Sequence, residues 1–517
     1  MKELVYHRHL LPSVERNPDK VAVIDGAYSA TYAQHLDRVR CTAGALRSLG
    51  VGREDRFAIM ALNSHQFLEL YHAAFLGAGI ANPLNLRLAA KELAFILADS
   101  GTKVCFTDAF FAPVIDQVKS EAGLEHVVMI GAGDAPHDAD YEDVLAAATP
   151  AIPDEPEETD PVILMYTGGT TGTPKGVLLD HRAEMLNMYH VALAWRFTPD
   201  EVYLHQTPMF HAASMSGVVG APAEGGISVI VPLFDPVAVM DAIEQHKVTM
   251  TVMVPTMIGM LMAHEAFEPE RLDSLVRLTY GASPMPAALL DKVLKAFPTL
   301  DIFQGYGMTE SAAVLTVLGP DEHRAGGPRL RSAGIPLRGV TLSVQDPDGK
   351  PVATGESGEV CARGGNFMRE YWKREDATAD AFRGGWYHSG DAGYLDEDGY
   401  LFLVDRVKDM IVTGGENVYS VEVENAIASH PDVAQVAVIG IPDEVWGEAV
   451  HAIVVPHEGA HPTAEMIIAH ARESIAGYKI PKSVEIRAEP LPLSGALKVL
   501  KRDLRAPYWA GQERSVN

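Results

Sequence analysis

One short polar segment carries the residue types that bind phosphate. It lies in LMYTGGTTGTPKGV, residues 164–177, directly after an apolar run. Glycines let backbone N–H groups turn toward an anion, threonine hydroxyls add donors, and a lysine adds positive charge. The residues expected to contact phosphate oxygens are Thr167, Gly168, Gly169, Thr170, Thr171, Gly172 and Lys175.

Two other interpretations of this segment are a Walker loop and a mobile surface turn. A Walker loop requires Gly, four residues and then Gly-Lys-Ser/Thr, whereas here Pro174 precedes Lys175 and Gly176 follows it. The Walker interpretation therefore fails. The other interpretation is a mobile glycine-rich surface turn. This segment alone does not distinguish such a turn from a phosphate-binding loop, so the rest of the chain must decide between them.

A second group of candidate residues lies in QGYGMTE, residues 304–310. Thr309 offers a hydroxyl to a phosphate oxygen, and Glu310 offers a hard carboxylate to Mg²⁺, which prefers oxygen ligands. The alternative is a threonine that caps the helix predicted at ESAAVL. Asp391, in YHSGD, is a carboxylate suited to accept both hydrogen bonds of a ribose diol, or else begins a β-turn at DAGY.

The composition restricts the ligands of this chain. With 69 acidic and 42 basic residues the net charge is −27, a field that repels nucleic acid and anionic lipid. Any anionic ligand must therefore be held by local donors. The three cysteines are far apart and form no CxxC motif, which argues against disulfides or a cysteine-based metal site. The charged N-terminus does not fit a signal peptide, and we expect a cytoplasmic protein.

The elements that position these residues are predicted from apolar runs that alternate with amphipathic segments. RFAIMAL, KVCFTD, HVVMIG, VILMYT, ISVIVPL and VTMTVMVP are such runs. This alternation predicts an α/β fold with helices covering largely parallel sheets. The run at 248–264 is broken by Pro255 and is predicted as strand, turn and helix rather than a membrane span.

A polar stretch at 394–418 marks a predicted domain boundary. The segments beyond it predict a small α+β unit of about 110 residues, close to the usual domain size. We therefore expect an N-terminal domain at 1–405, built from stacked α/β subdomains, and a C-terminal domain at 406–517.

Five separated segments then agree with one family. In chain order they are YTGGTTGTPKG, QGYGMTE, YHSGD, DRVKDMIVTGGENV (405–418) and LSGALKVLKR (493–502). In order and spacing they resemble the adenylate-forming superfamily, which includes acyl- and aryl-CoA synthetases, firefly luciferase and adenylation domains. The resemblance covers essentially the whole chain. Gly168 stands where that family usually has Ser, and Ser494 and Leu497 stand where Thr and Gly are common; the first departure puts rate rather than reaction in doubt.

The resemblance implies roles for named residues. Lys498 would bridge the substrate carboxylate and the α-phosphate. Because Lys498 and the thiol cannot occupy the same space, we expect the C-terminal domain to turn about a hinge at the polar boundary, at Lys408. The residues expected to be catalytic are Lys498, Thr309, Glu310 and His211. The further residues expected to bind ATP or AMP are Gly281, Ala282, Gly305, Tyr306, Gly307, Asp391 and Arg406. Among these, the resemblance implies that Tyr306 would stack on adenine and that the small residues Gly281 and Ala282 would let the flat base lie against the backbone. The residues expected at the acid and CoA sites are His211, Met215, Met253, Gly307, Met308 and Gly415. Core packing is the alternative for His211 and the methionines.

The predicted activity is that of an ATP-dependent acid–CoA ligase. A hydrophobic carboxylate would displace pyrophosphate from Mg·ATP to give an acyl-adenylate, and coenzyme A would then displace AMP. The alternatives are transfer to a carrier protein, a luciferase-like oxygenase and a non-catalytic nucleotide sensor. The sequence does not reveal which fatty, aryl or sterol-derived acid is used, and a homodimer stays open.

Overall fold

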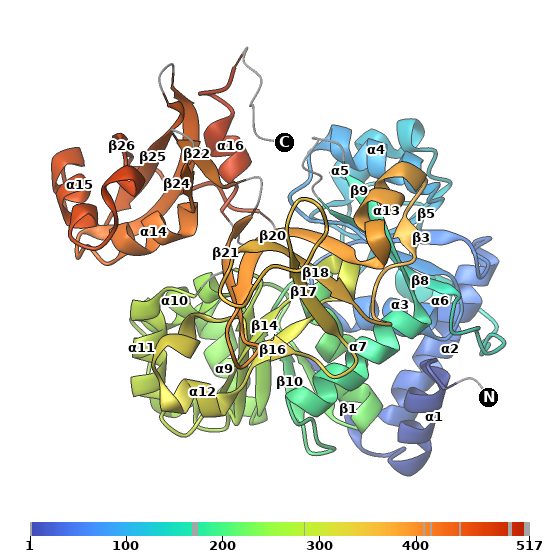
Figure 1. The fold of residues 1–517 in the computed structure, drawn as a ribbon. Helices are drawn as coiled ribbons and strands as arrows, with labels where there is room; N and C mark the ends of the chain where they lie inside the picture. Colours follow the sequence, from blue (N-terminus) through green and yellow to red (C-terminus); the bar gives the residue numbers. More distant parts are fainter. Residues whose placement is uncertain are drawn as a thin grey trace.

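The computed structural model describes residues 3–167, 174–283, 285–406, 409–413, 416–443, 446–494 and 499–510 (Figure 1). At residues 405 and 406 it describes the backbone alone. Of the predicted site residues, those that lie outside this description are Gly168, Gly169, Thr170, Thr171, Gly172, Lys408, Gly415 and Lys498.

Two largely parallel sheets form the body of the large domain. The first has the order β19-β9-β8-β4-β3-β5-β6-β7, and β9 and β19 are its antiparallel members. Its strands are β3 Arg56–Met60, β4 Ile80–Pro83, β5 Val104–Asp108, β6 His126–Ile130, β7 Ala139–Asp140, β8 Pro161–Thr167, β9 Lys175–Asp180 and β19 Glu370–Tyr371. Their apolar runs are buried, as parallel strands covered on both faces require.

The second sheet has the order β16-β15-β14-β13-β12-β10-β11-β1-β2, and it is parallel from β14 to β1. Its strands are β1 Val21–Asp25, β2 Tyr28–Thr31, β10 Val202–His205, β11 Ile227–Ile230, β12 Met250–Met253, β13 Arg277–Gly281, β14 Asp301–Tyr306, β15 Thr316–Leu318 and β16 Ile335–Pro336. β12 is followed by helix α10 (Pro255–Ala263), as predicted for residues 248–264.

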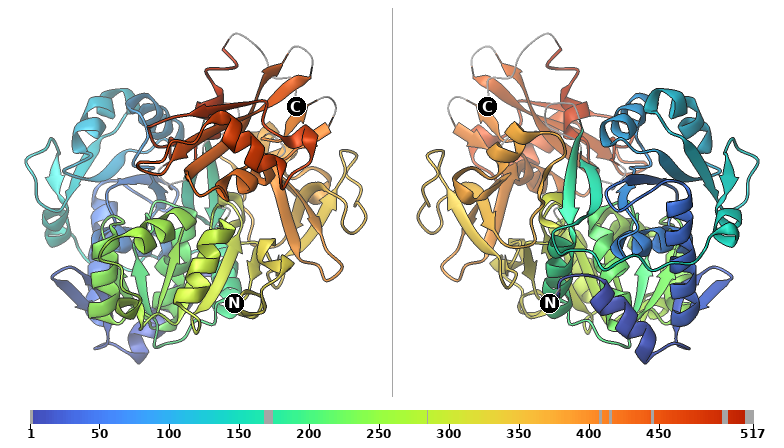
Figure 2. Two further views of the ribbon diagram at one scale, coloured as in Figure 1. Left: turned by 90° about the vertical axis from the view of Figure 1, so that its left-hand side faces the viewer. Right: turned by 90° about the vertical axis from the view of Figure 1, so that its right-hand side faces the viewer.

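Helices cover these two sheets (Figure 2). They are α1 His7–Arg16, α2 Tyr32–Ser48, α3 His65–Phe75, α4 Ala90–Ser100, α5 Ala112–Ala122, α6 Tyr141–Ala147, α7 His181–Ala194, α8 Ala221–Glu224, α9 Pro236–His246, α11 Ala287–Ala296, α12 Pro320–Ala325 and α13 Glu375–Ala381. Several begin at a polar cap; for example, the Asp180 side chain accepts the Ala183 N–H at the start of α7. No helix among the residues described is long and apolar enough to cross a membrane.

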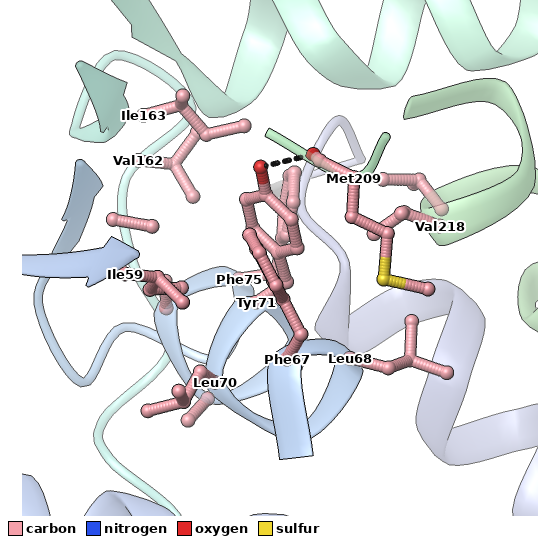
Figure 3. Close-up of a cluster of buried hydrophobic side chains, with 14 of the residues drawn as sticks. Ile59, Phe67, Leu68, Leu70, Tyr71, Phe75, Val162, Ile163, Met209 and Val218 are labelled. Carbon is pink, nitrogen blue, oxygen red and sulfur yellow. Dashed lines mark hydrogen bonds between the residues drawn. The ribbon is translucent and has the colours of Figure 1, made fainter. Parts of the chain in front are cut away.

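The largest core joins the two sheets. Helix α3 buries every residue from Gln66 to Phe75, because it packs between strands of both sheets. Figure 3 shows Tyr71 of α3 donating a hydrogen bond of 2.8 Å to the Met209 carbonyl, among apolar side chains from both subdomains. Burying such a side chain stabilises the fold by roughly 1.5–3 kcal/mol, so this shared core fixes how the two sheets sit together.

A four-stranded antiparallel sheet completes the large domain. Its order is β17-β18-β20-β21, with bounds Thr341–Gln345, Gly358–Arg363, Tyr387–Leu395 and Leu401–Arg406. After it the chain enters a separate lobe with its own apolar cores (Figures 1 and 2). That lobe contains β22 Ile411–Thr413, β23 Glu416–Val418, β24 Val433–Asp443, β25 Gly447–Pro456, β26 Ser483–Ile486, α14 Ser420–Ala428, α15 Ala464–Arg472 and α16 Lys501–Arg505.

The predicted architecture is confirmed: a large α/β N-terminal domain precedes a small α+β C-terminal domain. Arg87 of the large domain donates a hydrogen bond of 2.9 Å to the Leu493 carbonyl of the small domain. Within the small domain, Arg505 pairs with Asp409 at 2.7 Å, close to the point where the chain enters it. The boundary between residues 405 and 406 stays a prediction.

Candidate active site

The candidate site lies where several parallel strands of the second sheet end. In open α/β sheets, ligands bind in the crevice beyond the carboxyl ends of the strands. Here β10, β12, β13 and β14 deliver the segments that carry His211, Ala282 and Tyr306 to one edge. The fold therefore brings together three predicted site segments that are far apart in sequence.

The backbones of β13 and β14 approach closely where these strands end. Gly281 and Gly305 are paired in register, and a Cβ on Gly281 would lie 2.2 Å from the Gly305 carbonyl oxygen. Ala282 follows with a φ of +67°. Only glycine at position 281 permits this approach, so the strand ends present backbone rather than side chains. Such a surface suits a planar base, the role predicted for these residues.

Tyr306 and Asp391 are in direct contact. The Tyr306 hydroxyl donates a hydrogen bond of 2.7 Å to Oδ2 of Asp391. Asp391 lies within β20, rather than at the start of a turn, and pairs in register with Arg406 of β21. The tyrosine predicted to stack on adenine therefore touches the carboxylate predicted to bind ribose, and the Arg406 backbone runs beside them.

A carboxylate on β18 fixes the chain just before Asp391. Glu359 lies 2.8 Å from Nδ1 of His388, accepts the Gly390 N–H at 3.1 Å and pairs with Arg383 at 2.7 Å. Cys361 lies 3.3 Å from the same histidine nitrogen. Because Glu359 holds both His388 and the Gly390 amide, it fixes the part of β20 that directly precedes Asp391.

Tyr371 links the end of the phosphate segment to the predicted metal ligand. Its hydroxyl donates a hydrogen bond of 2.8 Å to Oε1 of Glu310, and Lys175 Nζ lies 5.0 Å from the centre of its ring. Burial, together with the negative charge of Glu310, raises the pKa of Tyr371 above its ordinary value. The hydroxyl therefore stays protonated and remains a donor to the carboxylate.

Sequence patterns did not reveal Tyr371 as a site residue. It belongs to no motif, and the pairing of Tyr371 in β19 with Val177 in β9 brings it beside Lys175.

Strands β8 and β9 form a hairpin, and the phosphate segment connects them. Thr167 ends β8, Lys175 begins β9, and the two are antiparallel partners. A Walker loop instead connects a strand to a helix, so the topology also excludes that interpretation.

A small apolar cavity lies beside the strand ends. Its lining residues are Thr207, Pro208, His211, Ala213, Val254, Met257 and Ala282. His211 thus borders the same space as Ala282, as the predicted acid site requires. Met215 and Met253 are not among the lining residues; they are buried in the two largest apolar cores. Met308 is partly buried against apolar clusters, and the assignment of all three to the acid site stays a prediction.

The turn after Glu310 is strained. Thr309–Ser311 forms one 3₁₀ turn, and the next residues, Ala312 and Ala313, have φ angles of +52° and +99°. Non-glycine residues in such conformations cost on the order of 1–3 kcal/mol each and persist only where surrounding contacts enforce them. The segment that carries Thr309 and Glu310 is therefore held in place by its neighbours.

Comparison with known proteins places this geometry in a family. The protein-family model described as AMP-binding enzyme matches residues 11–372. The family model described as AMP-binding enzyme C-terminal domain matches residues 422–498. The chain belongs to the AMP-binding enzyme family. The membership predicted from the five segments is thereby confirmed.

Two named relatives and one solved structure match this chain over nearly its whole length. A feruloyl-CoA synthase from Streptomyces sp is 39% identical and covers 95% of this chain and 96% of its own. The fatty acid–[acyl-carrier-protein] ligase ScoC of Streptomyces coeruleorubidus is 34% identical, covering 97% and 96%. The structure of o-succinylbenzoate CoA synthetase (MenE) from Bacillus subtilis, in complex with the acyl-adenylate intermediate OSB-AMP, has a TM-score of 0.85 at 29% identity and covers 98% of each chain.

The first prediction concerns the Tyr371 hydroxyl. Tyr371→Phe keeps the ring beside Lys175 but removes the donor to Glu310, and a hydrogen bond to a charged group contributes about 1.5–3 kcal/mol. We expect the KM for MgATP to rise by roughly tenfold or more, because tenfold corresponds to about 1.4 kcal/mol. Initial rates of acid-dependent pyrophosphate release at varied MgATP measure this.

The matched control is Tyr400→Phe. Tyr400 also donates to a glutamate, Glu322, at 2.6 Å, but that pair joins β20–β21 to α12 away from the strand ends. This control should leave the KM for MgATP unchanged. Equal effects of the two substitutions would show that Tyr371 has no particular role at the nucleotide site.

Proposed function

We propose that this chain is an ATP-dependent acid–CoA ligase that activates a hydrophobic carboxylic acid as an acyl-adenylate and transfers the acyl group to coenzyme A. The observation that carries the proposal is the convergence of Tyr306 with Asp391, and of Lys175 with Glu310 through Tyr371, beside the cavity that His211 lines. The relatives named as acid–CoA ligases bear out the enzyme class predicted from the sequence.

In the first step the acid is activated. A carboxylate oxygen attacks the α-phosphorus of ATP, the bond to the bridging oxygen breaks, and pyrophosphate leaves with that electron pair. Tyr306 and the strand ends at Gly281 and Gly305 orient the adenosine, with Asp391 on the ribose. Lys498 is proposed to offset the repulsion between the two anions as charge develops in the transition state, where fixed donors contribute most.

The residues present fit a magnesium ion at Glu310. Tyr371 binds one oxygen of this carboxylate, Oε1, and does not bind the second, and Thr309 precedes Glu310 in the same 3₁₀ turn. Mg²⁺ prefers hard oxygen ligands and commonly joins one or two carboxylates to substrate phosphates. A bound Mg²⁺ would neutralise negative charge on the phosphates. Lys175, across the Tyr371 ring, would add positive charge on the other side.

In the second step the thioester forms. The coenzyme A sulfur attacks the acyl carbon, the bond to the AMP oxygen breaks, and the thiol proton leaves to solvent. Lys498 and the thiol need the same space at different times. We therefore keep the proposal that the small domain turns about Lys408 and that Gly415 borders the path of the thiol; both residues lie outside those the structure describes.

The acid is proposed to bind in the cavity beside His211. Most of its wall is apolar, with contributions from Pro208, Val254 and Met257, so its chemistry suits the apolar part of an acid. The feruloyl-CoA synthase relative favours including aryl-propenoic acids among the candidates. A cytoplasmic location and a homodimer stay predictions.

The remaining alternatives differ in the acceptor of the acyl group. The relative ScoC, named as an acyl-carrier-protein ligase, supports transfer to a carrier protein. A luciferase-like oxygenase would share the nucleotide site but use oxygen instead of a thiol. Each alternative therefore predicts a different product from the same adenylate.

The second prediction is the product formed from ATP, coenzyme A and a panel of aryl, fatty and sterol-derived acids. We expect AMP, pyrophosphate and an acyl-CoA thioester in equal amounts, detected by chromatography and mass spectrometry. A reaction that forms acyl-AMP but no thioester, and releases AMP only with an added carrier protein or with oxygen uptake, would contradict coenzyme A as the acceptor.

The third prediction separates the two steps. Lys498→Ala should slow acid-dependent pyrophosphate release by roughly 10²–10³-fold, the scale for losing one transition-state donor. Thioester formation from pre-made acyl-adenylate should be spared. Single-turnover measurements of both half-reactions check this, and Lys501→Ala, which removes a neighbouring lysine paired with Glu424 at 2.7 Å, is the control. Equal loss in both half-reactions would refute the assignment.

A further inference from the structure

Two buried asparagines bind the strained turn that follows Glu310. Asn187 of α7 donates to the Val314 carbonyl at 2.9 Å and to the Ser311 carbonyl at 3.4 Å. Asn366, just before β19, donates to the same two carbonyls at 2.9 Å for Ser311 and 3.3 Å for Val314. The two amides, which we call the asparagine clamp, therefore bind the start and the end of the turn.

The residues between these carbonyls are the strained ones. Ala312 and Ala313 both have positive φ, in the region that favours glycine. Their conformation reverses the chain, so that the Leu315 N–H donates to the Tyr306 carbonyl at 2.7 Å and the Ala313 N–H to the Met308 carbonyl at 3.1 Å. The clamp thus holds a turn that folds back on the segment carrying Thr309 and Glu310.

The turn has little room to relax without moving that segment. A Cβ on Gly307 would lie 2.1 Å from the Ala313 carbonyl oxygen, so the turn packs directly on the backbone of the YGMTE motif. On its other side the Met368 N–H donates to the Glu310 carbonyl at 2.7 Å. A change in the turn is therefore transmitted to Glu310.

We infer that Asn187 and Asn366 are positioning residues for the nucleotide site: they hold Ala312 and Ala313 in their left-handed conformation and thereby set the places of Thr309 and Glu310. The inference rests on the proposed function for the roles of Thr309 and Glu310. Neither asparagine needs to touch a substrate. Both are buried, with exposed fractions of 5% and 0%, so their amide hydrogens act within the protein.

The alternative is that the asparagines only stabilise the fold. Substitutions of a buried amide lower stability in either case, because they leave polar atoms without partners. Strain separates the two accounts. If the clamp enforces a positive φ at Ala313, then glycine at that position, which adopts such an angle freely, removes the need for it.

The test combines Asn366→Ala with Ala313→Gly in the full-length chain. We expect Asn366→Ala to lower kcat/KM for MgATP in acid-dependent pyrophosphate release by at least tenfold, and the double variant Asn366→Ala, Ala313→Gly to recover most of that loss. Asn187→Ala should behave like Asn366→Ala and serves if Asn366→Ala does not fold. Ala313→Gly alone should stay within a few-fold of the parent.

The matched control is Asn82→Ala. Asn82 is also fully buried and donates to two hydroxyls, those of Ser100 and Thr102, each at 3.3 Å, and these partners lie at and just after the end of α4, outside the predicted site segments. Its substitution should lower the thermal midpoint without changing kcat/KM for MgATP. The inference is overturned if Asn366→Ala keeps the parent kinetics, if Ala313→Gly restores nothing, or if Asn82→Ala causes the same kinetic loss.

If the proposed function is wrong, the parent protein itself will show no acid-dependent cleavage of ATP. The clamp would then still be tested by the thermal midpoints of the four proteins: parent, each single variant and the double variant. Coupled residues deviate from additivity. Ala313→Gly should raise the midpoint more in the Asn366→Ala background than in the parent, and additive midpoints would overturn the inference.

Discussion

The hydrogen bond from Tyr371 to Glu310 is the contact on which the arrangement of the site depends. It joins the strand β19, which pairs with the strand that begins at Lys175, to the turn that carries the predicted metal ligand. Because Lys175 lies on the ring of the same tyrosine, the cationic end of the phosphate segment and the carboxylate are held at opposite parts of one side chain. Both charged groups are therefore held by contacts with one tyrosine side chain.

The two sheets supply the rigidity that this contact needs. Lys175 and Tyr371 belong to the first sheet, whereas Glu310 follows β14 of the second. Helix α3 packs between them, and the shared core around Tyr71 fixes one sheet against the other. The candidate nucleotide site therefore lies between two subdomains, where small-molecule sites commonly occur.

Much of this could be predicted from the sequence. The apolar run before Thr167 and the strand and helix around Pro255 are local signals, because hydrophobic period and a breaking proline act within a few residues. The motif residues Tyr306 and Asp391 were expected at one site, and the structure places them in contact.

Other features could not be predicted, for physical reasons. Tyr371, Asn187 and Asn366 act through strand pairing and burial between distant segments, and a lone tyrosine or asparagine has no periodicity or spacing that reveals it. The left-handed conformation of Ala312 and Ala313 could not be predicted either, because alanine disfavours it locally and the surrounding contacts enforce it. The sequence also could not decide between a pocket and a core for Met215 and Met253, because an apolar side chain suits both. The structure buries both methionines in cores.

The central claim is that ATP is cleaved at its α-phosphorus by the acid itself, before any thiol takes part. Exchange of labelled pyrophosphate into ATP tests this most directly, because it requires reversible formation of an acyl-adenylate on the enzyme. With an accepted acid and Mg²⁺ present, the account predicts exchange that depends on the acid and proceeds without coenzyme A. Exchange that requires coenzyme A, or cleavage of ATP to ADP and phosphate, would contradict it.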